Sequence, residues 1–315
     1  MVELVIAFAL DLLVGDPPYS WHPVRIIGGW IQKTESWLRT HIPDASLAGW
    51  IQAIFIPTVV YVFVWFLTEV AFQISPMLKS ILVIYFLYSS ISVKDLASEA
   101  RRVHLALRNH KLEAARESLS RIVGRDTQNL SETEVVRGTV ETVAESFVDG
   151  ILSPLFYVAL GGAPLVMAYK AINTLDSMVG LRTPEYREYG RAAARLDAIA
   201  NWVPARISWL LIGLAAFFVS GRAQEAWHVA TQNFLGAGFA NGIIPEAAFA
   251  GALGIELGGI NYYSGQKFET RKLGIAMRSL EPSDIRRAVD LMNASSWAAL
   301  VFAVILQLFA SLTFS

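Results

Sequence analysis

Long apolar runs separated by polar stretches dominate the chain. A helix needs about 20 apolar residues to cross a bilayer, and residues 48–72, 78–93, 203–220 and 297–314 meet or approach that length. We expect each of them to be a membrane-spanning helix. The first residues, MVELVIAFALDLLVGD, lack a basic start and include Asp11, so they predict a retained membrane segment rather than a cleaved signal peptide.

The apolar run at residues 151–168 is interrupted at 161–164 by Gly-Gly-Ala-Pro. Glycine and proline interrupt a helix and leave backbone N–H and C=O groups without their helical partners. A membrane tolerates such groups only where protein or a cavity covers them. We therefore expect a broken or re-entrant helix. That arrangement also puts the basic regions 94–150 and 170–202 on one cytoplasmic side, as the positive-inside rule requires.

The predicted fold class follows from this pattern. It is an all-α, polytopic integral membrane protein with about four to five spans. We expect one membrane domain over residues 1–315, with a polar helical insertion, on the cytoplasmic side, at 94–150.

Composition agrees with a membrane protein and excludes several functions. The 315 residues are 54% hydrophobic and 17% charged, whereas soluble domains are about 45–50% apolar and about 25% charged. A net charge of −1 provides no bulk attraction to nucleic acid, and we expect no such partner. The absence of cysteine excludes disulfides, thiolate metal sites and cysteine nucleophiles. Standard short catalytic motifs are also missing, so they assign no reaction.

Polar side chains directly follow the interrupted run. Residues 169–180 read YKAINTLDSMVG and include Lys170, Asn173, Thr174 and Asp176. Ionisable groups beside a bilayer are costly unless they are paired or hydrated, which indicates a functional site. Lys170 could contact a phosphate while Asn173 and Asp176 bind metal or substrate. The alternative is that Lys170 and Asp176 simply neutralise each other.

A second candidate lies on the helix that precedes the interrupted run. A capping-box pattern at 131–134, Ser-Glu-Thr-Glu, predicts a helix that continues to about Val148. Glu141, Glu145 and Asp149 recur every four residues and so share one face. Carboxylates in this arrangement suit Mg²⁺; the alternative is a solvated helix face.

Further polar groups lie in short turns. In Gly-Arg-Asp-Thr at 124–127, Arg125 could bind a phosphate or carboxylate in a bidentate manner. The alternative is that Arg125 pairs with Asp126 and holds the loop. His22 and Arg25 lie in a proline-fixed turn and could face an anionic ligand. The alternative for His22 is an interfacial anchor beside tryptophan.

Two more segments complete the set of candidates. Asn201 follows Asp197 by four residues, so the two can share a helix face. Arg195 and Arg206 flank them. The Gly-Gly and Tyr-Tyr pairs within residues 258–263 could shape a loop for a large ligand, but they favour a plain turn.

Five long motifs occur in order along the chain. They are DPPYSWHPVRIIG, IVGRDTQNLSETEVVRGTVETVAES, DGILSPLFYVALGGAPLVMAYKAINTLDSMVG, ARLDAIANWVPARISWL and PEAAFAGALGIELGG. Together they closely resemble the adenosylcobinamide-phosphate synthase family of cobalamin biosynthesis, over nearly the whole chain. The resemblance implies a bacterial or archaeal inner-membrane ligase. The reaction it implies joins adenosylcobyric acid to (R)-1-amino-2-propanol phosphate, or a related aminoalcohol, with ATP and Mg²⁺. Other membrane enzymes of the pathway are possible partners.

The resemblance also suggests roles for the candidate residues. Carboxylates that could hold Mg²⁺ on the nucleotide are Glu141, Glu145, Asp149 and Asp176. Cations that could contact phosphates are Arg125, Lys170, Arg182 and Arg206. The residues expected to act in catalysis are Asp176, Lys170, Glu145 and Asp197, with Asp197 or His22 as the base for the ammonium. Further substrate or nucleotide contacts are expected from Arg25, Asp126, Asn173, Thr174, Arg195, Asn201, Asn241 and Glu246.

Four motif positions depart from the family pattern. Ser146, Leu181 and Ala198 replace an asparagine, a frequent aromatic and a second aspartate. The loop at 237–241 reads Ala-Gly-Phe-Ala-Asn where the family usually has His-Pro-Ser-Pro-Asn. These departures leave open a second hypothesis, a catalytically impaired or redesigned member that keeps the fold or corrinoid binding. A transporter is a third, suggested by broken helices and embedded charges.

Overall fold

A computed structural model describes residues 1–16, 19, 21–181, 183–234, 236–263 and 265–313. It divides into two compact units. The first unit contains Met1–Ser92, Ser153–Val203 and Leu300–Ser315, and the second contains Val93–Leu152 and Pro204–Ala299. Pro17, Pro18 and Arg182, which the sequence analysis singled out, lie outside the described residues.

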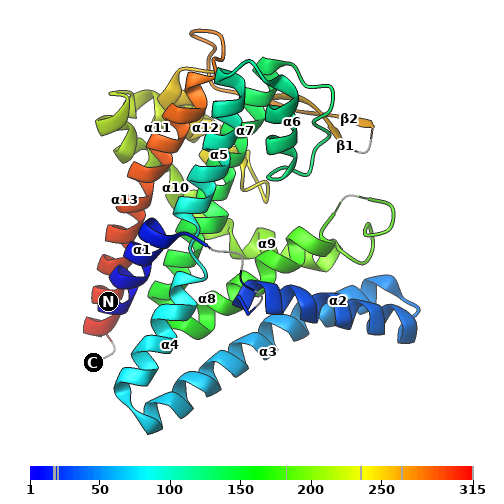
Figure 1. The fold of residues 1–315 in the computed structure, drawn as a ribbon, viewed down its shortest axis with the longest axis vertical. Helices are drawn as coiled ribbons and strands as arrows, with labels where there is room; N and C mark the ends of the chain where they lie inside the picture. Colours follow the sequence, from blue (N-terminus) through cyan, green and yellow to red (C-terminus); the bar gives the residue numbers. More distant parts are fainter. Residues whose placement is uncertain (17–18, 20, 182, 235, 264, 314–315) are drawn as a thin grey trace. The chain divides into compact units, whose positions relative to one another are not determined.

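The first unit is helical. Its complete helices are α1 (Val2–Val14), α2 (Pro23–His41), α3 (Ala45–Ile74), α4 (Pro76–Tyr88), α8 (Ser153–Val179) and α9 (Arg191–Ala200). Figure 1 shows α3 and α4 as a helical hairpin that turns at Ser75. Ser75 ends α3 and caps α4, since its side chain accepts a hydrogen bond from the Met77 backbone N–H.

A buried amide joins α2 and α3 to the chain that precedes α9. Gln52 of α3 donates to the Ile31 carbonyl at 2.7 Å and accepts from the Tyr189 hydroxyl at 2.8 Å. Gly49 permits this close approach, because a Cβ there would lie 2.0 Å from the Tyr189 carbonyl oxygen. Small side chains and a satisfied polar group therefore fix the packing around α3.

Helix α8 is broken where the sequence analysis expected a break. Gly161 and Gly162 have non-helical dihedral angles, and Gly162 has a φ of 63°. A residue with a side chain rarely adopts that conformation, whereas glycine does so without steric cost. Pro164 lies just beyond the break.

The second unit contains helices and one pair of strands. Its complete elements are α5 (Val93–Arg108), α6 (Leu112–Ser120), α7 (Glu132–Phe147), the π-helical turn η1 (Val148–Leu152), α11 (Ala223–Phe234), α12 (Ile243–Leu253), β1 (Leu257–Tyr263) and β2 (Gln266–Leu273). Helix α10 (Trp202–Val219) lies in this unit from Pro204, and α13 (Ser283–Thr313) lies in it up to Ala299. The predicted capping box at the start of α7 is confirmed, with Ser131 and Glu134 bonded to each other's backbone N–H groups.

The hairpin corrects one expectation. Residues 258–263, predicted as a plain turn, belong to strand β1, which pairs antiparallel with β2. The pairing is irregular between Leu257 and Gly259. Gly258 and Gly259 have φ values of 80° and 103°, so the glycines that suggested a turn allow an irregular strand instead.

Five segments are long and apolar enough to cross a membrane, by length and composition, within the described residues. They are Ala45–Ile74, Pro76–Arg108, Glu132–Val179, Trp202–Val219 and Ser283–Leu312. This confirms an all-α, polytopic membrane protein. Helices α1 and α12, with 13 and 11 residues, are shorter than a span.

Candidate functional site

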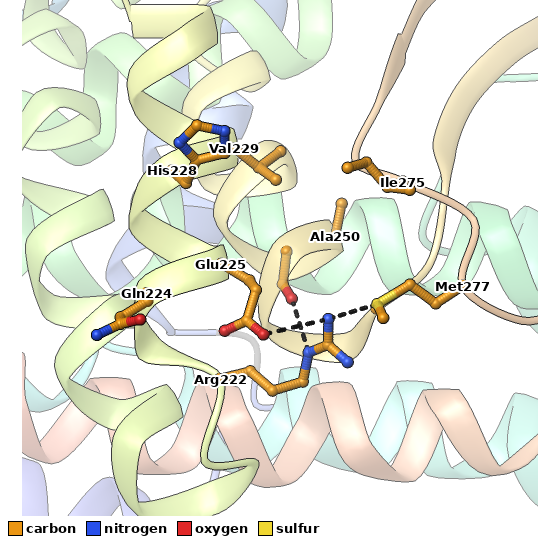
Figure 2. Close-up of a pocket in the computed structure, with 10 residues that line it drawn as sticks. Arg222, Gln224, Glu225, His228, Val229, Ala250, Ile275 and Met277 are labelled. Carbon is orange, nitrogen blue, oxygen red and sulfur yellow. Dashed lines mark hydrogen bonds and ion pairs between the residues drawn. The ribbon is translucent and has the colours of Figure 1, made fainter.

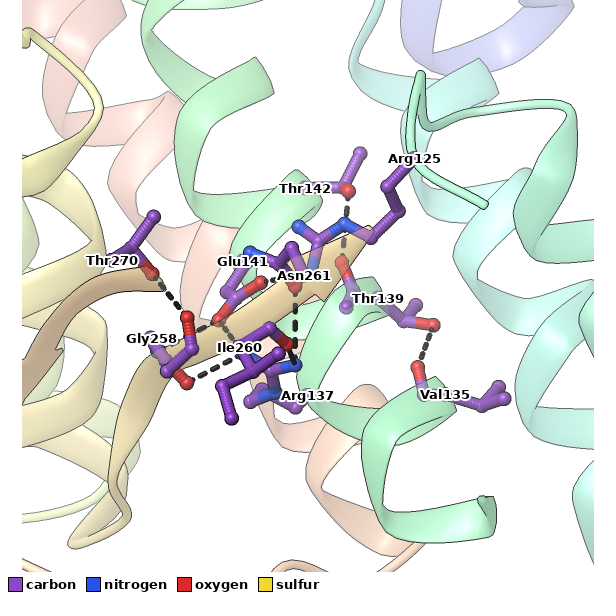
Figure 3. Close-up of polar contacts among 12 residues, drawn as sticks. Arg125, Val135, Arg137, Thr139, Glu141, Thr142, Gly258, Ile260, Asn261 and Thr270 are labelled. Carbon is purple, nitrogen blue, oxygen red and sulfur yellow. Dashed lines mark hydrogen bonds and ion pairs between the residues drawn. The ribbon is translucent and has the colours of Figure 1, made fainter. Parts of the chain in front are cut away.

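Arg125 and Glu141, two of the predicted residues, meet in a buried ion-pair network of the second unit (Figure 3). Their nearest atoms, Nη1 and Oε2, are 2.7 Å apart. The other carboxylate oxygen of Glu141 accepts from the Gly258 N–H at 2.8 Å and lies 3.5 Å from Arg137. Two guanidinium groups therefore neutralise Glu141 in this structure.

The same network holds the hairpin to α7. Arg137 donates to the carbonyls of Gly258 and Ile260 and to the side chain of Asn261. Arg125 also donates to Asn261, at 2.7 Å. Buried charges are tolerated when hydrogen bonds satisfy them in this way.

Asp126 ties the tip of the hairpin to the preceding loop. Its backbone N–H donates to the Tyr262 carbonyl at 2.8 Å, and its carboxylate accepts from the Gly265 N–H at 2.7 Å. These two contacts give Asp126 a role in positioning the hairpin.

Two other carboxylates converge on Gly242, just before α12. The Oε1 atoms of Glu145 and Glu246 each lie 3.4 Å from the place that a Cβ on Gly242 would occupy. Glu246 accepts no hydrogen bond from any residue that the structure describes. Burial raises the pKa of Glu246 well above its usual range, and the negative charges of Glu141 and Glu145 raise it further. The charges of Arg125 and Arg137 act against this rise in the pKa, so charges of both signs surround Glu246.

Arg206 fixes the loop that leads to Gly242. It donates to the Gly238 carbonyl at 2.7 Å and lies 3.5 Å from the side-chain oxygen of Asn241. Gly238 has a φ of 55°, which glycine adopts without strain. The altered loop at 237–241 therefore keeps a defined path, although it lacks the histidine and prolines usual in the family that it resembles.

A second polar cluster lies in the first unit around Asp197. Its carboxylate accepts from Asn201 at 3.0 Å and from Asn173 at 3.3 Å. The predicted common helix face of Asp197 and Asn201 is confirmed. Burial raises the pKa of Asp197, against the lowering effects of the two amides and of the Lys170 charge. A carboxylate whose pKa is raised is a stronger proton acceptor.

Asn201 extends this cluster into α8. Its side-chain oxygen accepts from the Ser153 hydroxyl at 2.6 Å and from the Tyr169 hydroxyl at 2.9 Å. Asn201 is 1% exposed, so all three groups need these bonds. The amide oxygen of Asn201 accepts these two bonds while its amide nitrogen donates to Asp197. Asn201 is therefore held in place and orients the Asp197 carboxylate.

Other predicted residues of α8 have local contacts. Lys170 is buried and acts electrostatically on Asp197. The Thr174 hydroxyl donates to the Lys170 carbonyl at 2.6 Å, which is a bond within the helix. Asp176 folds toward the helix end, since its Oδ1 lies 2.0 Å from the place of a Cβ on Gly180.

The N-terminal candidates lie in a helix cap. The Nδ1 of His22 accepts from the Val24 N–H at 3.3 Å, and its Nε2 lies 2.9 Å from Asp16. Both ring nitrogens therefore have protein neighbours, which makes Asp197 the better placed base. Arg25 and Arg195 are exposed.

One pocket of the second unit contains none of the predicted residues. It has a volume of about 580 Å³ and lies between α11, α12 and the segment around Met277 (Figure 2). Arg222 crosses it, donating to the Gly251 carbonyl at 3.3 Å and to the Met277 sulfur at 2.7 Å. The arginine is thus already bonded within the pocket.

Comparison with known proteins assigns the family. A family profile described as CobD/Cbib protein matches residues 4–292. The chain belongs to the CobD/CbiB family. No solved structure matches it.

CobD/CbiB relatives match along their whole length. Cobalamin biosynthesis protein CobD of Citrobacter koseri is 42% identical over 302 residues, 95% of each chain. The CobD protein of Clostridium perfringens is 36% identical over 308 residues, 98% of each. Cobalamin biosynthesis protein CbiB of Salmonella typhimurium is 39% identical over 302 residues, 95% of each. The family resemblance read from the motifs is therefore confirmed.

The carboxylates of this CobD/CbiB chain fit Mg²⁺ only as a partial set of ligands. No group of three or more Asp, Glu or His side chains among the described residues could hold a metal ion alone, so Glu141, Glu145 and Asp149 do not form a closed site. Mg²⁺ usually binds through one or two carboxylates together with substrate phosphates. Glu145 and Glu246, beside the space at Gly242, supply such a pair.

Sequence reasoning missed four residues of these clusters. They are Arg137, Gly242, Asn261 and Ser153. Arg137 precedes Glu141 by four residues on the same helix, a spacing that could have predicted their pairing. The other three become neighbours only through long-range packing, for which the sequence held no signal.

Proposed function

We propose that this chain is the ligase that forms an amide between adenosylcobyric acid and (R)-1-amino-2-propanol phosphate, using ATP and Mg²⁺. Membership of a family of cobalamin biosynthesis proteins supports the pathway. The observation that supports the reaction is the approach of two carboxylates, Glu145 and Glu246, to one point beside Gly242, with the pKa of Glu246 raised by burial and by the neighbouring negative charges.

The proposed chemistry needs an activated carboxylate. Transfer of the terminal phosphoryl group of ATP to the corrinoid carboxylate gives an acyl phosphate and ADP. The amine then attacks the acyl carbon and expels phosphate, forming the amide. Bound Mg²⁺ would neutralise charge on the transferring phosphoryl group.

Glu145 and Glu246 are the proposed Mg²⁺ ligands. The cation would offset the negative charges of Glu141 and Glu145, which, after burial, raise the pKa of Glu246. Arg206, which holds the adjoining loop, is the proposed phosphate contact. Asp149 and Asp176 remain candidate ligands.

Asp197 is the proposed proton acceptor for the amine. The attacking nitrogen must lose a proton as the amide forms, and Asp197 has a raised pKa and two amide donors that orient it. The charge of Lys170 acts against the rise in the pKa of Asp197 and so favours its ionised form. Both residues can be tested by isosteric substitution.

A turnover assay tests the proposal. Purified protein in detergent or nanodiscs is incubated with adenosylcobyric acid, the aminoalcohol phosphate, ATP and Mg²⁺. We expect equal amounts of amide product, ADP and phosphate, and no product with EDTA. A Glu145→Gln, Glu246→Gln double variant should lose product by at least about a hundredfold, whereas Glu269→Gln, an exposed carboxylate of β2, should retain it.

The altered loop at 237–241 favours one alternative, a family member that keeps corrinoid binding without turnover. Absence of product in the same assay, together with retained binding of adenosylcobyric acid in a spectroscopic titration, would reject the ligase in favour of that alternative. ATP-independent uptake into sealed vesicles would favour a transporter.

A further inference from the structure

A second pocket of the second unit gathers basic side chains that the proposed reaction does not use. Its volume is about 480 Å³. The residues that line it are His104, Leu107, Arg108, His110, Glu132, Pro282, Ser283 and Arg286. They come from the end of α5 and the starts of α7 and α13. Two arginines and two histidines thus face one carboxylate.

The two arginines of this pocket are exposed and have no partner among the described residues. Neither Arg108 nor Arg286 makes a hydrogen bond or ion pair with any residue that the structure describes. Elsewhere in the unit, Arg125, Arg137 and Arg278 pair with carboxylates. Unpaired guanidinium groups that share a pocket favour an anion, and their planar donors match phosphate oxygens in pairs.

His104 holds the two sides of the pocket together. Its Nδ1–H donates to the Pro282 carbonyl at 2.7 Å, which joins α5 to the segment before α13. That bond fixes the positions of the neighbouring groups on both helices. The pocket is therefore built by a specific long-range contact.

His110 occupies a backbone position that glycine would fill more easily. Its φ is 56°, and it is the non-glycine residue with a positive φ among those the structure describes. At the end of α5, the His110 N–H donates to the Leu107 carbonyl and the Lys111 N–H donates to the Ala106 carbonyl, each at 2.9 Å. This helix ending normally selects glycine. Histidine is among the non-glycine residues that adopt this conformation most often, and here it places an imidazole among the residues that line the pocket.

We propose that this pocket binds a phosphate-bearing ligand, with Arg108 and Arg286 as its two charged contacts and His110 as a further donor. The site is distinct from the residues assigned to amide formation. The same chemistry could come from a free phosphate compound or from the headgroup of an anionic phospholipid. The experiment separates these two sources.

The first arm uses inorganic phosphate. Isothermal titration of the full-length protein in phosphate-free detergent buffer should give saturable binding. Loss of one charge-assisted contact weakens binding by about tenfold or more, so Arg108→Ala and Arg286→Ala should each show at least that change. Arg101→Ala is the matched control, since Arg101 is an exposed residue of α5 outside the pocket; it should change binding by less than about twofold.

The second arm uses phosphatidylglycerol in mixed micelles, followed by native mass spectrometry. Retained lipid that depends on Arg108 and Arg286, without saturable phosphate binding, would assign the site to a headgroup. His110→Gly keeps the helix ending intact, so a fall in binding there with unchanged thermal stability reports the imidazole. Equal losses in Arg101→Ala, or no binding in either arm, would overturn the proposal.

Discussion

Replacing Glu246 with glutamine tests the central geometry of the proposed site. The Oε1 atoms of Glu145 and Glu246 each lie 3.4 Å from one point, the place of a Cβ on Gly242. The two oxygens are therefore at most about 7 Å apart, and unit charges at that separation repel by about 2 kcal/mol at an effective dielectric constant of 20. Glu246→Gln preserves the shape and removes this repulsion.

The variant should be more stable than the wild type at pH 8 without Mg²⁺. Relief of about 2 kcal/mol should raise Tm by roughly 5 °C. The folded state raises the pKa of Glu246 above its ordinary value of 4.5. Below pH 4.5 Glu246 is protonated in both the folded and the unfolded state and costs the fold nothing. The free energy of unfolding then falls as the pH rises through the folded-state pKa of Glu246. The difference between variant and wild type should accordingly disappear near pH 4.

Mg²⁺ should make the wild type more stable than Glu246→Gln. Ligand binding to the folded state raises its stability, so Mg²⁺ should raise the Tm of the wild type and leave that of Glu246→Gln unchanged. Thermal unfolding by circular dichroism in nanodiscs, from pH 4 to pH 8 with and without Mg²⁺, measures both effects. Glu269→Gln is the control for a general loss of negative charge. Equal Tm values for Glu246→Gln and wild type across this range would refute the reasoning.

Three further substitutions test the remaining clusters. Asp197→Asn should keep the fold, because the amide is isosteric, and lower turnover by about a hundredfold or more; unchanged turnover would remove Asp197 as the base. Arg137→Met should cost about 3–5 kcal/mol of stability, because it leaves buried partners unsatisfied, and faster proteolysis of the hairpin would report it; a loss below about 1 kcal/mol would contradict the network. Asp176→Ala should abolish turnover with membrane insertion intact, as measured by fractionation and product assay; full activity would exclude Asp176 from the site.

Much of the helical architecture could be predicted from local pattern. The apolar runs predicted the helices now seen at α3, α4, α10 and α13, because a bilayer-length apolar segment has few other stable conformations. The break in α8 followed from two adjacent glycines and a nearby proline. The hairpin was missed, because the glycines of β1 read as turn residues and their strand partner lay beyond them.

Parts of the candidate site were also visible in the sequence. Asp197 and Asn201 share a helix face because four residues nearly complete a turn, and their hydrogen bond confirms that prediction. The partners of Glu141 were not predictable in full. Arg125 and Gly258 reach it from distant parts of the chain, and no local periodicity encodes such a meeting.

The sequence by itself determined the family, the membrane-spanning helices and the main charged groups. Those properties depend on local composition, spacing and long motifs, which survive in the chain before it folds. Tertiary structure alone decided which charged groups surround each carboxylate. Glu141 lies between two arginines, whereas Glu246 lies beside Glu145 at Gly242. The physical reason is that the charge state of a carboxylate depends on burial and on neighbours a few ångströms away, and only folding brings those neighbours together.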